Sequence, residues 1–119
     1  GNSDGVFSVN DTTRWVAKLA TNAGPDASNA VRYFPVPGMA HCSGGPATDQ
    51  FDALGALVDW VEQGKAPSVL AATVNPDNKE LPAQWSKTRS RPLCAWPSVA
   101  RYSGSGDVES AANFRCVAP

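Results

Sequence analysis

The segment at residues 32–46 constrains the fold of this chain more than any other stretch. An apolar run of β-branched and aromatic residues at 31–36 ends in a proline-glycine corner, and His41, the only histidine of the chain, follows beside Cys42. This pattern predicts a strand that ends in a loop, and a loop held by a rigid element is where functional side chains are often presented. Histidine has an ordinary pKa near neutral pH, so His41 is the first candidate for proton transfer. A lone histidine on a loop is also commonly structural, so the role of His41 has to be judged from the other residues of the chain.

Helical patterns lie on either side of this segment. Asp11 or Thr12 can cap a helix that continues to residue 20, after which Gly24 and Pro25 end it. A second helix is expected from about Thr48 or Asp49 to Gly64. The order helix, strand, helix indicates an α/β fold.

The second helix carries an apolar stripe, which we expect to lie in the core. Four carboxylates lie off the stripe and are expected to be solvated. The stripe consists of Phe51, Leu54, Leu57, Val58 and Val61, and the carboxylates are Asp49, Asp52, Asp59 and Glu62.

Residues 67–119 are richer in loops than residues 1–66. A short strand at 68–74 is expected to end at a turn over 75–77, and residues 99–102 are predicted to form an edge strand. Residues 86–91 contain a group of basic side chains, which we interpret as a solvated loop, with contact to an acidic substrate group as the alternative. Asp107 can cap a last helical turn at 108–113.

Composition excludes several classes of partner. The chain has 119 residues, the length of one domain, with ten prolines and ten glycines, and its net charge is −1. This charge provides no positive field for nucleic acid or anionic lipid. No apolar run approaches the roughly 20 residues needed to cross a bilayer. The opening residues do not resemble a translation start, and we expect that a segment has been removed upstream.

The three cysteines do not form a zinc-binding pattern, because there is no Cys-x-x-Cys pair. Cys94 and Cys116 lie 22 positions apart in the least regular part of the sequence, where a disulfide would compensate for a small core. This pairing predicts an oxidising compartment, either secreted or periplasmic. Cys42 is then the odd cysteine, and its partner is expected elsewhere.

A histidine that acts as a general base usually has a carboxylate on one ring nitrogen and a nucleophile on the other. In α/β hydrolases the order along the chain is serine, acid, histidine. Asp4 lies one predicted helix and one predicted strand before His41, which is the spacing this order requires. Residues 1–5 also match the G-x-S-x-G elbow, which would make Ser3 the nucleophile, but no strand precedes Ser3. Ser43 and Ser105 have weaker claims.

Several segments resemble the C-terminal part of the tannase and feruloyl esterase family. The resemblance covers nearly the whole chain in the right order, and its most specific block is Gly-Met-x-His-Cys-x-Gly-Gly-Pro. The matching segments are Gly1 to Asp4, Val36 to Pro46, Phe51 to Leu54, Leu57 to Pro67, Arg91 to Cys94 and Tyr102 to Cys116. Ala95-Trp96, where relatives commonly have Pro-Tyr, is a minor departure.

The resemblance implies an exported serine hydrolase with an α/β-hydrolase core and an inserted lid. Its substrates would be esters of aromatic acids such as gallate, ferulate or a terephthalate monoester. By position, His41 matches the triad histidine and Asp4 the triad aspartate. Cys42 matches a cysteine paired with one beside the nucleophilic serine, and Cys94 and Cys116 match a second disulfide.

This chain has no counterpart of the family's nucleophile segment, its early strands or its lid, which holds a structural calcium. We therefore expect no cofactor in residues 1–119, and the remaining N-terminal part of the same enzyme as partner, joined through Cys42. The chain would be the C-terminal segment of an α/β-hydrolase domain. Residues 1–66 would hold the acid and the base, residues 67–119 would form a disulfide-bonded tail, and the chain alone would be inactive. A disulfide-stabilised binding module without catalysis, or an inactive fragment, is the alternative.

Overall fold

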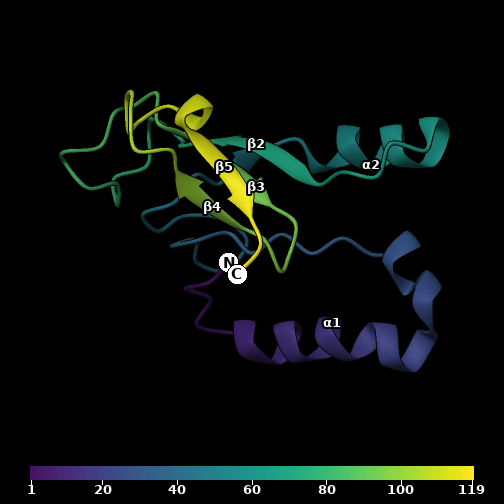
Figure 1. The fold of residues 1–119 in the computed structure, drawn as a ribbon. Helices are drawn as coiled ribbons and strands as arrows, with labels where there is room; N and C mark the ends of the chain where they lie inside the picture. Colours follow the sequence, from purple (N-terminus) through teal and green to yellow (C-terminus); the bar gives the residue numbers. More distant parts are fainter.

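Two antiparallel sheets form the body of the molecule, and two helices extend away from it (Figure 1). The computed structural model describes the backbone of residues 1–119 and all side chains except those of Ala20, Pro25 and Ser28. One sheet has the order β1-β2-β3 and the other pairs β4 with β5. The strands are β1 (Gln50–Phe51), β2 (Val69–Thr73), β3 (Ser90–Cys94), β4 (Val99–Tyr102) and β5 (Phe114–Val117). The predicted strands at 68–74 and 99–102 are confirmed.

The core lies between the first sheet and the segment at residues 34–47. Leu70 of β2 and Leu93 of β3 face one another in the ladder, and both are buried. Val36, Met39 and Ala47 pack against them, together with Ala72. The loop that bears His41 lies between Met39 and Ala47, so buried contacts hold both of its ends.

Helix α1 (Val9–Ala23) confirms the first predicted helix, although its cap differs from the prediction. Ser8 is the N-cap residue, and its hydroxyl accepts a hydrogen bond from the Asp11 backbone N–H. Residues Pro25–Asn29 form a short 3₁₀ helix after α1.

Helix α2 (Ala53–Gln63) begins later than predicted and ends at Gly64 as predicted. Residues 50 and 51 pair instead with Thr73 and Ala72 as strand β1. The helix starts at Asp52, whose carboxylate accepts a hydrogen bond from the Gly55 N–H. Gly64 has a φ of 68°, which is the left-handed conformation that glycine adopts readily.

Residues 31–36 do not form the predicted strand. A strand requires a hydrogen-bonded neighbour, and no ladder of the described chain includes this segment. Its carbonyls accept isolated hydrogen bonds instead of a ladder: Tyr33 accepts from the Trp96 N–H at 2.8 Å, and Val36 accepts from the N–H groups of Asn2 at 2.9 Å and Met39 at 3.4 Å.

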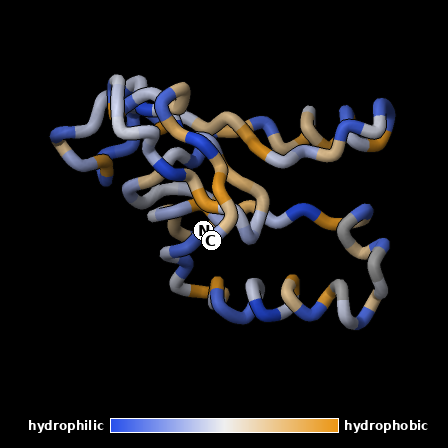
Figure 2. Tube along the Cα trace, viewed as in Figure 1, coloured by the Kyte–Doolittle hydropathy of each residue, from blue (hydrophilic) through white to orange (hydrophobic). Residues whose placement is uncertain are grey.

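The predicted apolar stripe packs on the core at Phe51, in β1, but its part in α2 does not lie in the core of this chain, contrary to the prediction. Leu54 is 71% exposed, Leu57 51% and Val61 76%. Figure 2 shows hydrophobic positions along this projecting helix. The reason is that α2 extends beyond the sheet, so nothing in the described part of the chain covers this face. Asp59 and Glu62 are solvated as predicted.

The prediction of a solvated basic loop at 86–91 is wrong for its two arginines, Arg89 and Arg91. Arg89 forms an ion pair with Glu109 and lies 3.8 Å from the centre of the Trp85 ring. Arg91 belongs to β3 and stacks on the Phe114 ring at 4.1 Å. Both arginines therefore join the tail segments to one another.

The mixed α/β class and the disulfide-bonded tail are confirmed. Cys94 at the end of β3 is bonded to Cys116 in β5. The last helical turn is a 3₁₀ helix at Ala111–Asn113, capped by Ser110 and not by Asp107. Within the described residues, the helices are too short or too polar to cross a membrane.

Candidate active site

Asp4 and His41 lie side by side although 37 positions separate them. His41 Nδ1 is 2.9 Å from Asp4 Oδ2. The N-terminal residues reach this position by hydrogen bonding to the segment before His41: Ser3 N–H donates to the Met39 carbonyl at 3.0 Å. Gly1 permits the approach, since a Cβ there would lie 2.0 Å from the Met39 oxygen.

The Asp4 carboxylate is held by three hydrogen bonds. Its Oδ1 accepts from the backbone N–H groups of Val6 at 2.7 Å and Phe7 at 3.0 Å, while Oδ2 faces His41. The Phe7 N–H, then His41 and the Val6 N–H lower the pKa of Asp4 from 3.8 to about 2. Asp4 is therefore an ionised carboxylate at neutral pH.

The Asp4 charge determines which nitrogen of His41 carries the proton. An ionised carboxylate can only accept hydrogen bonds, so neutral His41 has its proton on Nδ1 and donates it to Asp4. Nε2 then keeps a free lone pair. The His41 side chain is 45% exposed whereas that of Asp4 is 9% exposed, so the imidazole is accessible while its carboxylate partner is sheltered. This arrangement can accept a proton from a group that approaches Nε2.

No nucleophile completes this pair in the described part of the chain: no serine hydroxyl there is hydrogen-bonded to His41. Ser3 is followed by turns, and α1 begins only at Val9, so the sharp strand-to-helix turn of an elbow is not formed. Ser43 donates its backbone N–H to the His41 carbonyl at 2.8 Å, a contact within the loop. Cys42 is exposed and has a free thiol.

Three polar residues that hold the His41 loop were missed in the sequence. Asp49, predicted to be solvated, accepts a hydrogen bond from the Gly44 N–H at 2.9 Å. Asn78 and Glu80 bind the carbonyl and the N–H of Gly45 at 2.8 and 2.7 Å. The last two contacts span 33 and 35 positions, so local spacing carried no signal for them.

The Phe7 ring was also not singled out as a site residue. It lies 5.5 Å from the His41 ring, measured between centroids, and is tilted by 43°. The Phe7 side chain therefore lies beside the exposed imidazole.

Asp49 is ionised as well. Burial opposes its charge, but hydrogen bonds from the Gln50 side chain and the Gly44 N–H outweigh burial and lower the pKa of Asp49. No group of three His, Cys, Asp or Glu side chains suited to a metal ion occurs among the described residues.

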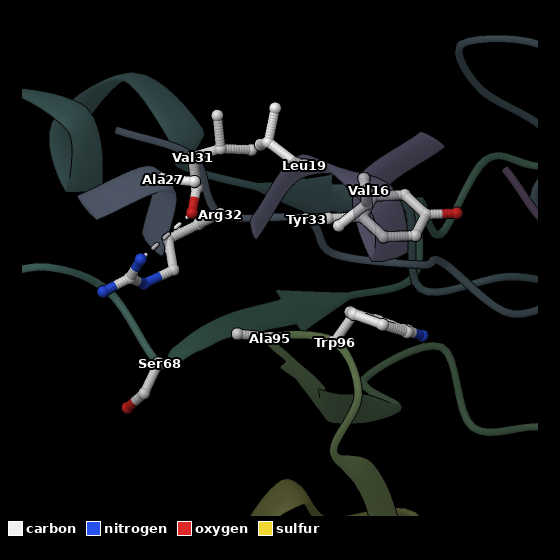
Figure 3. A pocket seen from close by; sticks show the side chains of 9 residues that line it. All are labelled: Val16, Leu19, Ala27, Val31, Arg32, Tyr33, Ser68, Ala95 and Trp96. Carbon is white, nitrogen blue, oxygen red and sulfur yellow. Dashed lines mark hydrogen bonds between the residues drawn. The ribbon is translucent and has the colours of Figure 1, made fainter. Parts of the chain in front are cut away.

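A separate apolar cavity of about 310 Å³ lies between α1 and the end of β3. Figure 3 shows Val16 and Leu19 of α1 on one side and Trp96 on the other. Neither Asp4 nor His41 lines it. The acid-base pair thus lies at a loop, with the imidazole exposed and its carboxylate partner sheltered, and it does not form the floor of this cavity.

The chain is similar in sequence to known ester hydrolases. The family model for tannase and feruloyl esterase matches residues 1–117. A mono(2-hydroxyethyl) terephthalate hydrolase from Piscinibacter sakaiensis is 46% identical over 127 positions, covering 100% of this chain and 19% of the relative. A probable feruloyl esterase from Arthroderma benhamiae is 38% identical, covering 78% of this chain and 17% of the relative.

Solved structures agree in fold. An esterase from Aspergillus oryzae superposes with a TM-score of 0.75 at 25% identity, covering 96% of this chain and 25% of the other. A tannin acyl hydrolase from Aspergillus niger gives a TM-score of 0.66 at 22% identity, covering 98% and 21%. The chain spans about a fifth of the length of the curated relatives named here.

Proposed function

This chain belongs to the tannase and feruloyl esterase family, and we propose that it supplies the acid and base of a serine ester hydrolase, Asp4 and His41. The observation that carries the proposal is the 2.9 Å contact between His41 Nδ1 and the ionised Asp4, which leaves Nε2 available. The nucleophilic serine belongs to a segment outside residues 1–119.

In the first half of the reaction, His41 Nε2 takes the proton of the serine hydroxyl as the oxygen attacks the ester carbonyl. The imidazole becomes a cation 2.9 Å from the Asp4 carboxylate, which stabilises it. His41 then gives the proton to the leaving alcohol. An acyl-enzyme and a free alcohol result.

In the second half, a water molecule loses its proton to His41 Nε2 and attacks the acyl group. The proton returns to the serine oxygen as the acid product leaves. Backbone N–H groups near the serine bind the oxyanion in both halves. Residues 1–119 thus hold and move the proton, whereas the oxyanion site lies with the serine.

The exposed apolar face of α2 supports a larger enzyme as the functional unit. Leu54, Leu57 and Val61 are spaced as on a helix that packs against other elements, yet all three are exposed in this chain. About four fifths of the length of each relative lies outside the part that matches this chain. We propose that the rest of the same enzyme covers this face.

The proposed substrates are esters of aromatic acids, in line with the relatives named as feruloyl esterase, tannin acyl hydrolase and mono(2-hydroxyethyl) terephthalate hydrolase. The contacts that discriminate between these rings are assigned to the lid, outside this chain. An exported location is proposed from the Cys94–Cys116 disulfide.

We expect the full-length enzyme to hydrolyse methyl ferulate, methyl gallate or mono(2-hydroxyethyl) terephthalate. Residues 1–119 expressed alone should hydrolyse none of them, because they provide a base without its serine. Chromatography of the released acid measures the activity of the full-length enzyme and of residues 1–119 alone. Lack of activity of the full-length protein on all three esters, with the protein folded, would favour a non-catalytic binding module instead.

Cys42 is expected to be disulfide-bonded in the full-length enzyme, to a cysteine outside residues 1–119. Its thiol is exposed beside His41, and φ of 64° at Cys42 is a conformation that needs external support. Peptide mapping without reduction should find Cys42 linked to a distant peptide, with the Cys94–Cys116 link as internal control. Complete alkylation of Cys42 in the unfolded, unreduced protein would contradict this pairing.

A further inference from the structure

The backbone of the loop that bears His41 includes a strained residue next to the histidine. Cys42 has a φ of 64°, which is unfavourable for a residue with a side chain, whereas Gly44 and Gly45 adopt their φ values of 78° and 74° readily. The bonds within the loop are few: Ala40 N–H donates to the Gly44 carbonyl at 3.1 Å and Ser43 N–H to that of His41 at 2.8 Å. A backbone of this kind persists when its surroundings determine it.

The surrounding support converges on Gly45, which is buried. Glu80 Oε2 accepts its N–H at 2.7 Å, and Asn78 Nδ2 donates to its carbonyl at 2.8 Å. We call Asn78 and Glu80 the Gly45 clamp. Asn78 Oδ1 also accepts the Glu80 N–H at 2.8 Å, so the two clamp residues are held relative to each other. Both peptide groups of Gly45 are thereby bound by one short segment between β2 and β3.

Gly45 also connects the clamp to the turn at residues 36–39, which binds the residues directly before Asp4. A Cβ on Gly45 would lie 2.2 Å from the Gly38 carbonyl oxygen, so the two backbones are in direct contact. Gly38 lies between Val36 and Met39, whose carbonyls bind the N–H groups of Asn2 and Ser3. Asp4 follows directly. A displacement of Gly45 would therefore shift His41 relative to Asp4.

We propose that Glu80 is a positioning residue, whose carboxylate sets the place of His41 against Asp4 by holding the Gly45 N–H. This rests on the proposed function of His41 as the base. The bond is charge-assisted and short, and it is the contact of the clamp that satisfies a buried N–H. Glu80 itself has no described contact with the imidazole.

The test uses three substitutions of Glu80 in the full-length enzyme, assayed on the ester it hydrolyses best. Glu80→Gln keeps the length and an acceptor oxygen, Glu80→Asp keeps the charge but is shorter by about 1.5 Å, and Glu80→Ala removes the group. Displacing catalytic groups by about 1 Å can lower turnover by about 100-fold. We expect kcat to fall by about 10- to 100-fold for Asp and Ala, with KM unchanged within about threefold, and Gln to keep kcat within about threefold.

Asp77→Ala is the matched control. It removes a carboxylate from the same segment, and the Asp77 side chain makes no described contact. It should leave kcat unchanged. The proposal is overturned if Glu80→Asp keeps the kcat of the control, or if Glu80→Gln loses as much as Glu80→Asp. If Glu80→Ala does not fold, the Gln and Asp variants alone decide.

His41→Ala in the same enzyme distinguishes a failure of the positioning role of Glu80 from a failure of the proposed function of His41. If His41→Ala is inactive while Glu80→Asp and Asp77→Ala are equally active, the positioning role fails and the proposed function stands. If His41→Ala keeps full activity, the proposed function fails first. Urea unfolding of each variant, measured alongside, shows whether a lower kcat follows from less folded protein, which would also overturn positioning.

Discussion

His41→Ala should lower the kcat of the full-length enzyme by about 10⁴-fold or more, with little change in KM. The imidazole is the group that takes the serine proton and returns it, and its Nε2 is the free ring nitrogen opposite the Asp4 contact. Substrate binding does not depend on that proton, so the effect falls on turnover. Burst and steady-state kinetics on a chromogenic aromatic ester measure it.

Added imidazole provides the control for His41→Ala. A small base diffusing into the space left by the side chain should restore part of the rate, whereas it cannot repair a misfolded loop. A His41→Ala enzyme that retains more than about a tenth of the wild-type kcat would show that His41 is not the base.

Asp4→Asn should lower kcat by about 10⁴-fold. Two backbone N–H groups, from Val6 and Phe7, point at the Oδ1 position, so the oxygen of the new side-chain amide must stay there to accept them. The NH₂ group of that amide then faces His41 Nδ1. The imidazole has to accept at Nδ1 and carries its proton on Nε2, where a base needs a lone pair. The substitution is therefore nearly isosteric but imposes the wrong tautomer.

The same variant tests the ionisation of Asp4 through stability. The pKa of Asp4 is lowered from 3.8 to about 2 on folding, so its charged form stabilises the protein fully above about pH 4. This contribution is lost as the pH falls from about 4 through about 2. The difference in unfolding free energy between wild type and Asp4→Asn should shrink over that range in urea titrations. A difference independent of pH would mean that the Asp4 pKa is not lowered.

Much of the chain was predictable because the deciding interactions are local. Apolar spacing and a glycine stop located α2, and short runs bounded by turn residues located β2 and β4. The pairing of Cys94 with Cys116 followed from their place in the least regular part of the sequence. Helix starts were displaced by a few residues, since several neighbouring polar side chains can cap a helix. For α2, the pairing of β1 with β2 moved the start to Asp52.

In the candidate site, too, some features were predictable from the sequence and others required the tertiary structure. His41 and Asp4 could be chosen from residue type, chain order and a family motif, because proton transfer demands particular side chains in a particular sequence of elements. Their 2.9 Å contact, the exposure of the α2 stripe and the roles of Asn78 and Glu80 depended on tertiary structure. These features arise from hydrogen bonds and packing between residues more than 30 positions apart, or from surface left uncovered, and no periodicity along a chain encodes either.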